Sequence, residues 1–167
     1  PVDVCRYFFV TRGLNTHLDF DLTLALDQSK KNPVYYVQYA NARIHSIFRE
    51  CGEPPGQINI EHLAVSAAGQ AEREALLFWL LRFPELVQDI ARNYEIQRLP
   101  EYLYQTATLF TSFYHAKNNR IKDLLAANAG EAALLLSLCN LTTQVIETGL
   151  ALIGITAVRE MHREDAD

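Results

Sequence analysis

Apolar residues recur every three or four positions along most of the chain, and strict alternation of apolar and polar residues is nearly absent. This spacing is typical of amphipathic helices and not of strands. Glycine and proline, with seven and six copies, interrupt the pattern at few places. The sequence therefore predicts an all-α fold.

The first third of the chain predicts three helices. A short one covers 3–12, and the turn residues 13–16 end it. A second begins near Asp19 or Asp21, because either carboxylate can cap a helix N-terminus. The clearest signal is Asn32-Pro33, since asparagine is a favoured N-cap and proline suits the first helical position. This third helix runs from residue 33 to about 51.

Residues 52–69 predict the only long loop, and the pattern is helical again beyond it. The expected helices cover 72–83, 84–93, 100–118 and 131–153. The helix over 100–118 carries an apolar stripe formed by Leu103, Ala107, Phe110 and Tyr114. The last helix carries another, formed by Leu134, Leu138, Leu141, Val145 and Leu152. Each stripe leaves water only when it packs against the apolar stripe of another helix, so we expect an antiparallel helix bundle.

The helix over 33–51 carries two stripes of different character. Val37, Ala40, Ile44 and Phe48 share one face, which we expect to enter the core. Tyr36, Tyr39 and Arg43 follow at i, i+3 and i+7, at the edge of that face. Two aromatic rings and a guanidinium on one line favour the stacking of unpaired RNA bases. The alternative is a row of tyrosines at the boundary of the core, with hydroxyls in water.

Composition narrows the class of protein. The net charge is −5, which does not favour nucleic-acid binding, but residues 1–50 hold six Lys/Arg against five Asp/Glu and are the less acidic part. Three cysteines lie far apart without a CxxC pair, so neither a zinc ribbon nor a disulfide framework is expected. No secretion signal opens the chain and no apolar run is long enough for a bilayer. These features predict a cytoplasmic protein that contacts no membrane, and the first residue, Pro1, suggests a fragment.

Three separate motifs resemble the arginyl-tRNA synthetase family, a group of class I aminoacyl-tRNA synthetases. They are Cys5–Val10 (CRYFFV), Thr16–Leu22 (THLDFDL) and Asn32–Arg43 (NPVYYVQYANAR), in the order and spacing of the segment after that family's second ATP-binding signature. Shorter matches to its C-terminal helical domain include Glu72–Leu76, Phe83-Pro84, Leu103-Tyr104, Phe113-Tyr114, Thr148–Leu150, Leu152–Ile155 and Arg159–Met161. The resemblance covers nearly the whole chain.

The resemblance implies an anticodon-binding domain of the DALR type, with arginine tRNA as the partner. It implies tRNA contacts at Tyr36, Tyr39, Arg43, Tyr114 and Met161. This chain has Asn41 where the family usually has histidine. Residues 1–31 would end the catalytic half, and 32–167 would form the anticodon-binding domain.

Catalysis is not expected from this chain alone. Neither a His-x-Gly-His signature nor a Lys-Met-Ser-Lys-Ser loop occurs in the 167 residues, so no cofactor is expected here. The resemblance implies ATP and magnesium for the full-length enzyme, whose own catalytic domain would be a second partner, and a monomer. A helical protein–protein interaction module that binds no RNA remains the alternative.

Overall fold

The computed structural model describes residues 2–13, 21–27, 29, 31–54, 56, 66–117 and 119–161. Every regular element within these residues is an α-helix. The helices are α1 (Val2–Val10), α2 (Leu22–Leu26), α3 (Pro33–Cys51), α4 (Gln70–Leu81), α5 (Phe83–Asn93), α6 (Arg98–His115), α7 (Ile121–Ala127) and α8 (Ala129–Leu152). The predicted all-α class is confirmed.

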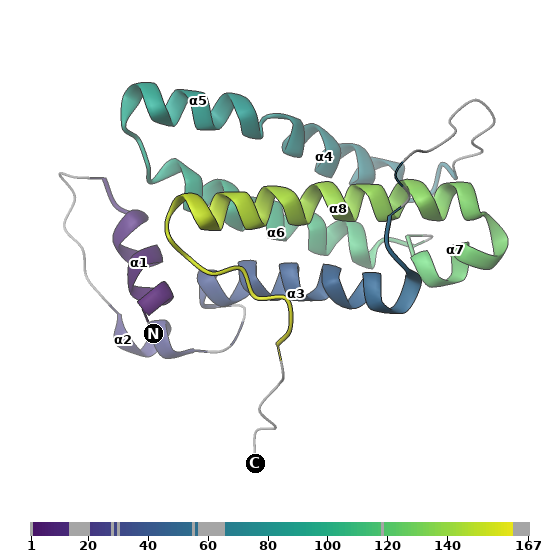
Figure 1. The fold of residues 1–167 in the computed structure, drawn as a ribbon, viewed down its shortest axis with the longest axis horizontal. Coiled ribbons are helices and arrows are strands. Elements are labelled where there is room, and N and C mark those ends of the chain that lie inside the picture. The colour runs from purple at the N-terminus through teal and green to yellow at the C-terminus, as the bar shows by residue number, and fades with distance from the viewer. Residues whose placement is uncertain are drawn as a thin grey trace, which may run out of the picture.

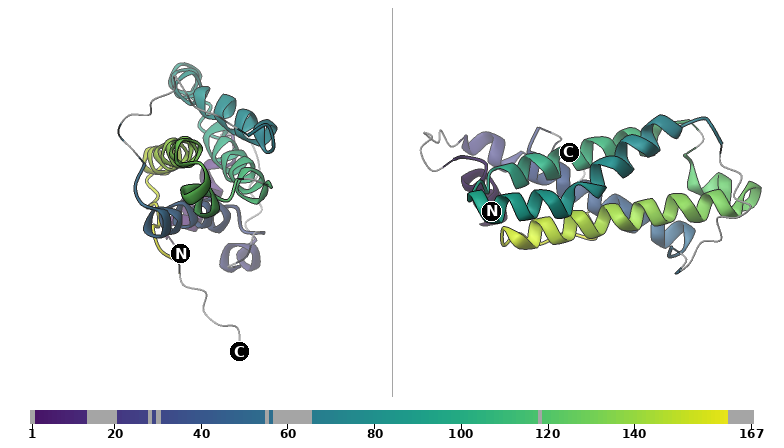
Figure 2. Two further views of the ribbon diagram at one scale, coloured as in Figure 1. Left: turned by 90° about the vertical axis from the view of Figure 1, so that its right-hand side faces the viewer. Right: turned by 90° about the horizontal axis from the view of Figure 1, so that it is seen from above.

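The long helices form a bundle in three layers (Figures 1 and 2). Helices α6 and α8 lie in the middle, α4 and α5 follow one another on one side, and α3 covers the other side. Helix α8 runs antiparallel to both α3 and α6, whereas α3 and α6 run in the same direction. Helices α1 and α2 lie at one end of the bundle and α7 at the other. This arrangement leaves one long face of α3 on the surface.

The starts of α2 and α3 follow from their capping residues. Asp21 Oδ1 accepts a hydrogen bond from Leu24 N at 3.0 Å, which confirms one of the two predicted caps; Asp19 lies outside the described residues. Asn32 Oδ1 accepts from Val34 N at 3.1 Å, and Pro33 occupies the first turn as predicted. Gly52 ends α3 with φ +90°, a conformation that residues with a side chain rarely adopt.

The core joins α3, α6 and α8 through the predicted stripes of the first two helices. Val37, Ala40, Ile44 and Phe48 are buried, as are Leu103, Ala107 and Phe110. Helices α6 and α8 approach closely at Gly149, where an added Cβ would lie 2.6 Å from Leu103 Cδ2. A side chain at this position would therefore force Leu103 to move from its place in the core.

Two predictions about the second half of the chain are wrong. Leu138 and Val145 of the stripe expected on α8 are buried as predicted, but Leu134 and Leu141 are only half-buried and Leu152 is 54% exposed. Leu135 and Ile146, outside the expected stripe, are fully buried. Helix α8 is apolar on most sides and contacts α3, α4, α6 and α7, so its sequence did not distinguish one face. Helix α7 is not among the predicted helices, because its seven residues lie between the helices predicted over 100–118 and 131–153.

Helix α8 is 24 residues long and apolar enough to cross a membrane by length and composition alone. Half of its most apolar window is buried inside the bundle. The central helix of a bundle is expected to have this character, because neighbours cover it on several sides.

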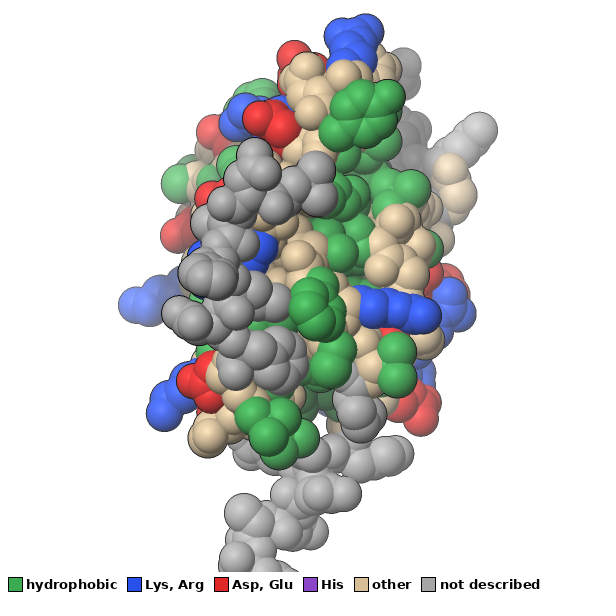
Figure 3. Space-filling view, turned by 90° about the vertical axis from the view of Figure 1, so that its left-hand side faces the viewer, with side chains coloured by type: hydrophobic (Ala, Val, Ile, Leu, Met, Phe, Trp, Pro, Cys, Tyr) green, Lys and Arg blue, Asp and Glu red, His purple; other side chains and the backbone are tan. Residues whose placement is uncertain are grey.

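The end of the bundle formed by α1 and α2 presents apolar side chains to the surface (Figure 3). Val2 and Phe9 on α1 are 63% exposed, and Leu22 and Leu26 on α2 are 63% and 68% exposed. Large apolar side chains gathered at one place on a surface commonly mark a contact with another part of a protein.

Candidate nucleic-acid interface

The surface stripe of α3 is formed by exposed Tyr39 and by half-buried Tyr35 and Arg43, spaced i, i+4 and i+8 along the chain. Consecutive members lie one turn apart on the same side of the helix. The rings of Tyr35 and Tyr39 are stacked, with centroids 6.4 Å apart and planes 13° apart. Tyr39 is 40% exposed. The structure thus provides a short aromatic surface that ends in a guanidinium.

Tyr36 does not belong to this surface, contrary to the sequence-based expectation. Its side chain is 8% exposed, its ring packs 5.3 Å from that of Tyr104, and its hydroxyl donates to Thr111 Oγ1 at 3.0 Å. The reason is that α6 packs beside the edge of the buried face and covers this position. Tyr36 therefore joins α3 to α6. Tyr35 occupies the position beside Tyr39 that the sequence pattern had assigned to Tyr36.

Arg43 and Tyr114 come together across α3 and α6. Arg43 Nη2 donates to Tyr114 Oη, and Arg43 Cζ lies 4.8 Å from the centroid of the tyrosine ring. The ring of Tyr114 also packs against Phe110, with centroids 6.1 Å apart. Tyr114 is therefore half in the core and half at the surface, and it holds the guanidinium of Arg43 at the end of the aromatic stripe.

The C-terminal segment, residues 155–161, lies along another side of α3 (Figure 1). Gln38 Nε2 donates to the carbonyl of Thr156 at 3.0 Å, and Asn41 Nδ2 donates to the carbonyl of Val158 at 3.1 Å. Glu160 pairs with Arg49 at 3.4 Å. Met161 follows directly and is half-buried. These contacts bring the fifth predicted site residue to the same helix as Tyr39 and Arg43.

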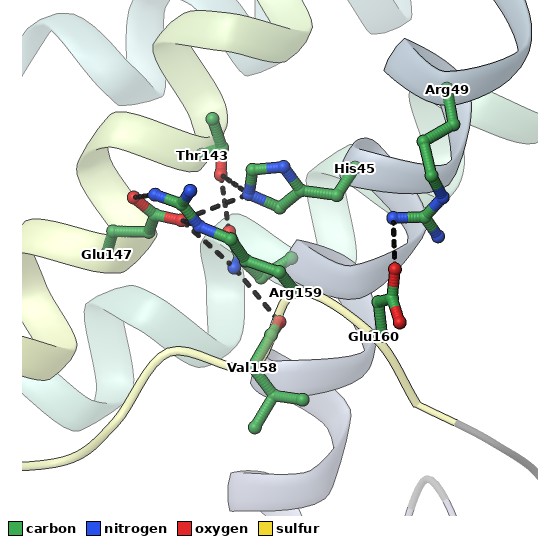
Figure 4. A network of polar contacts seen from close by, with 8 residues as sticks. His45, Arg49, Thr143, Glu147, Val158, Arg159 and Glu160 are labelled. Atoms are coloured by element: carbon green, nitrogen blue, oxygen red, sulfur yellow. Dashed lines mark hydrogen bonds and ion pairs between the residues drawn. The ribbon is translucent and has the colours of Figure 1, made fainter.

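Glu147 on α8 connects the C-terminal segment to the bundle (Figure 4). Its carboxylate accepts two hydrogen bonds from Arg159, at 3.0 and 3.2 Å, and lies 3.0 Å from His45 Nε2. Asn41, where the family usually has histidine, reaches the same carboxylate at 3.5 Å and also accepts from Thr143 Oγ1. Burial raises the pKa of Glu147, but the hydrogen bonds from Arg159, His45 and Asn41 outweigh it, so the pKa lies below 4.5.

We expect Glu147→Gln to loosen the C-terminal segment, because the bonds from Arg159 and His45 lose their charged partner. The ionised carboxylate stabilises the fold above its ordinary pKa, and this contribution is lost as the pH falls through the lowered pKa. The difference in Tm between the wild type and the variant should therefore be largest at pH 7 and shrink below pH 4.5. Thermal unfolding followed by circular dichroism at several pH values measures it. Exposed Glu85, changed to Gln, is the control. A difference in Tm that does not vary with pH would show that the ionised carboxylate of Glu147 does not hold the C-terminal segment to the bundle.

The described residues contain no cluster of three His, Cys, Asp or Glu side chains that could hold a metal ion. The aromatic rings, the guanidinium and the docked C-terminal segment all lie on or beside α3. Tyr35 is not among the site residues predicted from the sequence. Its i, i+4 spacing to Tyr39 in the segment PVYYVQY indicates that the two rings share one side of the helix.

Residues 37–161 match a protein family described as the DALR anticodon binding domain. The chain belongs to this family. The matched range contains Tyr39, Arg43, Tyr114 and Met161, and it begins just after Tyr35 and Tyr36. Nothing in the match supports the alternative of a protein–protein interaction module.

Curated and solved relatives of this DALR domain are named as arginine–tRNA ligases or arginyl-tRNA synthetases. The chain is 47% identical over 163 residues to the arginine–tRNA ligase of Leptospira interrogans, covering 98% of this chain and 27% of the relative. It is 39% identical to the arginine–tRNA ligase of Coxiella burnetii, covering 95% of this chain and 26% of the relative. The arginyl-tRNA synthetase of Thermus thermophilus has the same fold, with a TM-score of 0.78 and 31% identity over 96% of this chain and 26% of that one. The chain thus spans about a quarter of the length of these relatives, and the predicted resemblance to arginyl-tRNA synthetases is confirmed.

Proposed function

We propose that this chain binds the anticodon loop of an arginine tRNA on the exposed face of α3. The observation that carries the proposal is the stripe of Tyr35, Tyr39 and Arg43, which ends at Tyr114. Unstacked loop bases gain about 1–3 kcal/mol each when they stack on aromatic rings. Tyr39 offers the more exposed ring for such a base, and Tyr35 supports it from behind.

Arg43 supplies the charged contact. Its planar guanidinium can bond a phosphate or a base edge with two parallel hydrogen bonds. Tyr114 restricts its side chain through the hydrogen bond and the ring contact before RNA arrives. Less conformational entropy is then lost on binding. Met161 adds an apolar contact beside the same helix, held there by the C-terminal segment.

Tyr36 contributes indirectly. Its buried ring and its bond to Thr111 fix α3 against α6, and this sets the distance between Tyr39 and Tyr114. We therefore assign Tyr36 to positioning the surface and not to touching RNA.

We further infer that the chain is part of an arginine–tRNA ligase, in which a separate catalytic domain attaches arginine to its tRNA with ATP and magnesium. The residues of this chain carry no nucleotide-binding signature, so that chemistry would belong to the remainder. The apolar side chains of α1 and α2 support a contact with the catalytic domain at that end of the bundle. A monomer in the cytoplasm, away from membranes, fits this role.

The test is equilibrium binding of the chain to an arginine tRNA and to the same tRNA with an altered anticodon. We expect tighter binding of the unaltered tRNA at both low and moderate salt, because base contacts and not phosphates provide the preference. Equal affinity for both RNAs would show that this surface does not read the anticodon.

A further inference from the structure

A second surface lies beside the aromatic stripe, at the α7 end of the bundle. It is a groove of about 890 Å³ between the C-terminal half of α3, the end of α6, α7, and the residues Ala116, Lys117 and Arg120 that lie between α6 and α7. Arg43 and Tyr114 line it where it meets the stripe, and Lys117, Arg120 and Lys122 line it farther on. The groove and the proposed base-stacking surface therefore share two residues and form one continuous path.

The groove is basic although the chain is acidic. Its lining includes four Lys/Arg side chains and two carboxylates, those of Glu50 and Asp123, while the whole chain carries a net charge of −5. Lys117, Arg120 and Lys122 are exposed, and none of them forms an ion pair within the part of the chain that the structure describes. A groove lined mainly by one sign of charge concentrates ions of the opposite sign, so this groove favours an anionic ligand.

We propose that this groove holds the sugar–phosphate backbone of the anticodon arm whose loop bases stack on Tyr39. The inference rests on the proposed function and extends it from the bases to the backbone. Lysine ammonium groups on flexible stems, such as those of Lys117 and Lys122, act as point charges toward phosphate. Such contacts position an RNA without reading its sequence. Arg43 stands at the junction, within reach of both the loop bases and the first phosphate in the groove.

Phosphate contacts in the groove would make RNA binding depend on salt, whereas an aromatic contact would not. Each phosphate neutralised by a Lys or Arg releases counterions, so the logarithm of the binding constant falls by about 0.7–0.9 per contact for each tenfold rise in salt. Removing two such contacts should make the salt dependence shallower by about 1.5. The preference for one anticodon over another should not change, because the groove reads no bases.

The experiment compares the double variant Arg120→Gln/Lys122→Gln with Arg82→Gln/Arg92→Gln in the full-length protein. Both pairs are exposed and change the net charge equally, but Arg82 and Arg92 lie on the α4–α5 layer, across the bundle from α3. We expect the groove variant to bind arginine tRNA roughly tenfold more weakly at low salt, with the shallower salt slope, and the control to match the wild type. Equal Tm values for the three proteins would confirm that all of them fold.

The outcomes separate this inference from the proposed function. Wild-type affinity and slope in the groove variant, or an equal loss in the control, would overturn the groove assignment while leaving the aromatic surface intact. A lost anticodon preference in the groove variant would also overturn it, because the groove would then read bases. If the wild type shows no anticodon preference but the groove variant still has the shallower slope, the groove stands as an RNA-backbone site and the proposed function fails.

Discussion

Replacing Glu131 by alanine should destabilise the protein by about 3–5 kcal/mol, because it removes the buried carboxylate that compensates the charge of Arg73. Arg73 Nη1 lies 2.6 Å from Glu131 Oε1, and the two side chains are 7% and 3% exposed. Glu131 also accepts from the backbone of Ser66 at 3.0 Å, and Arg73 Nε donates to Asn119 at 2.7 Å. The pair thus fixes α4, α8 and the end of the 52–69 loop to one another.

Urea unfolding followed by circular dichroism measures this loss, and Glu85→Ala is the matched control. Glu85 is exposed, so its replacement should change the free energy of unfolding by no more than about 0.5 kcal/mol. The double variant Arg73→Met/Glu131→Leu should be more stable than Glu131→Ala, because it leaves no unpaired charge in the core. A single variant as stable as the control would show that the pair does not hold these elements together.

The second large effect concerns RNA affinity. Tyr39→Ala should weaken binding of an arginine tRNA about 5- to 150-fold, which corresponds to the 1–3 kcal/mol expected for one stacked base. Tyr39 is 40% exposed and donates no hydrogen bond to the residues that the structure describes, so the fold should tolerate the change. Filter binding or fluorescence anisotropy with a labelled tRNA provides the measurement.

Two further tyrosines make this test selective. Tyr94→Ala removes a tyrosine that is 83% exposed at the far end of α5, and it should leave affinity unchanged. Tyr36→Phe keeps a buried ring and loses only the bond to Thr111, so its effect should be small. If Tyr36→Phe weakened binding as much as Tyr39→Ala, the assignment of Tyr36 to a positioning role would be wrong.

Features that depend only on residues close in the sequence, such as the ends and the buried face of a helix, could be predicted from local signals. The boundaries of α3 follow from Asn32, Pro33 and Gly52, and its buried face follows from the spacing of apolar residues. Helix α7 was not predicted because seven residues are too few for a periodic pattern. The buried face of α8 was misplaced because a helix apolar on most sides has no sequence signal that selects one of them.

The exposure of the candidate site residues was predicted less completely, because tertiary packing decides which side chains reach the surface. Tyr36 and Tyr39 look alike in sequence, and only the position of α6 buries the first and leaves the second exposed. The pairing of Arg43 with Tyr114 spans 71 residues and the network at Glu147 more than 100, so no local pattern contained them. The division of the chain at residues 31 and 32 stays a prediction.

The most direct test of anticodon recognition uses an RNA hairpin that contains only the anticodon arm of arginine tRNA. Without the rest of the tRNA, any binding must come from surfaces near the loop. We predict that the chain binds this hairpin more tightly than one with an altered anticodon, and that Tyr39→Ala removes the difference. Equal binding of both hairpins, or no binding by a folded chain, would contradict recognition of the anticodon by the exposed face of α3.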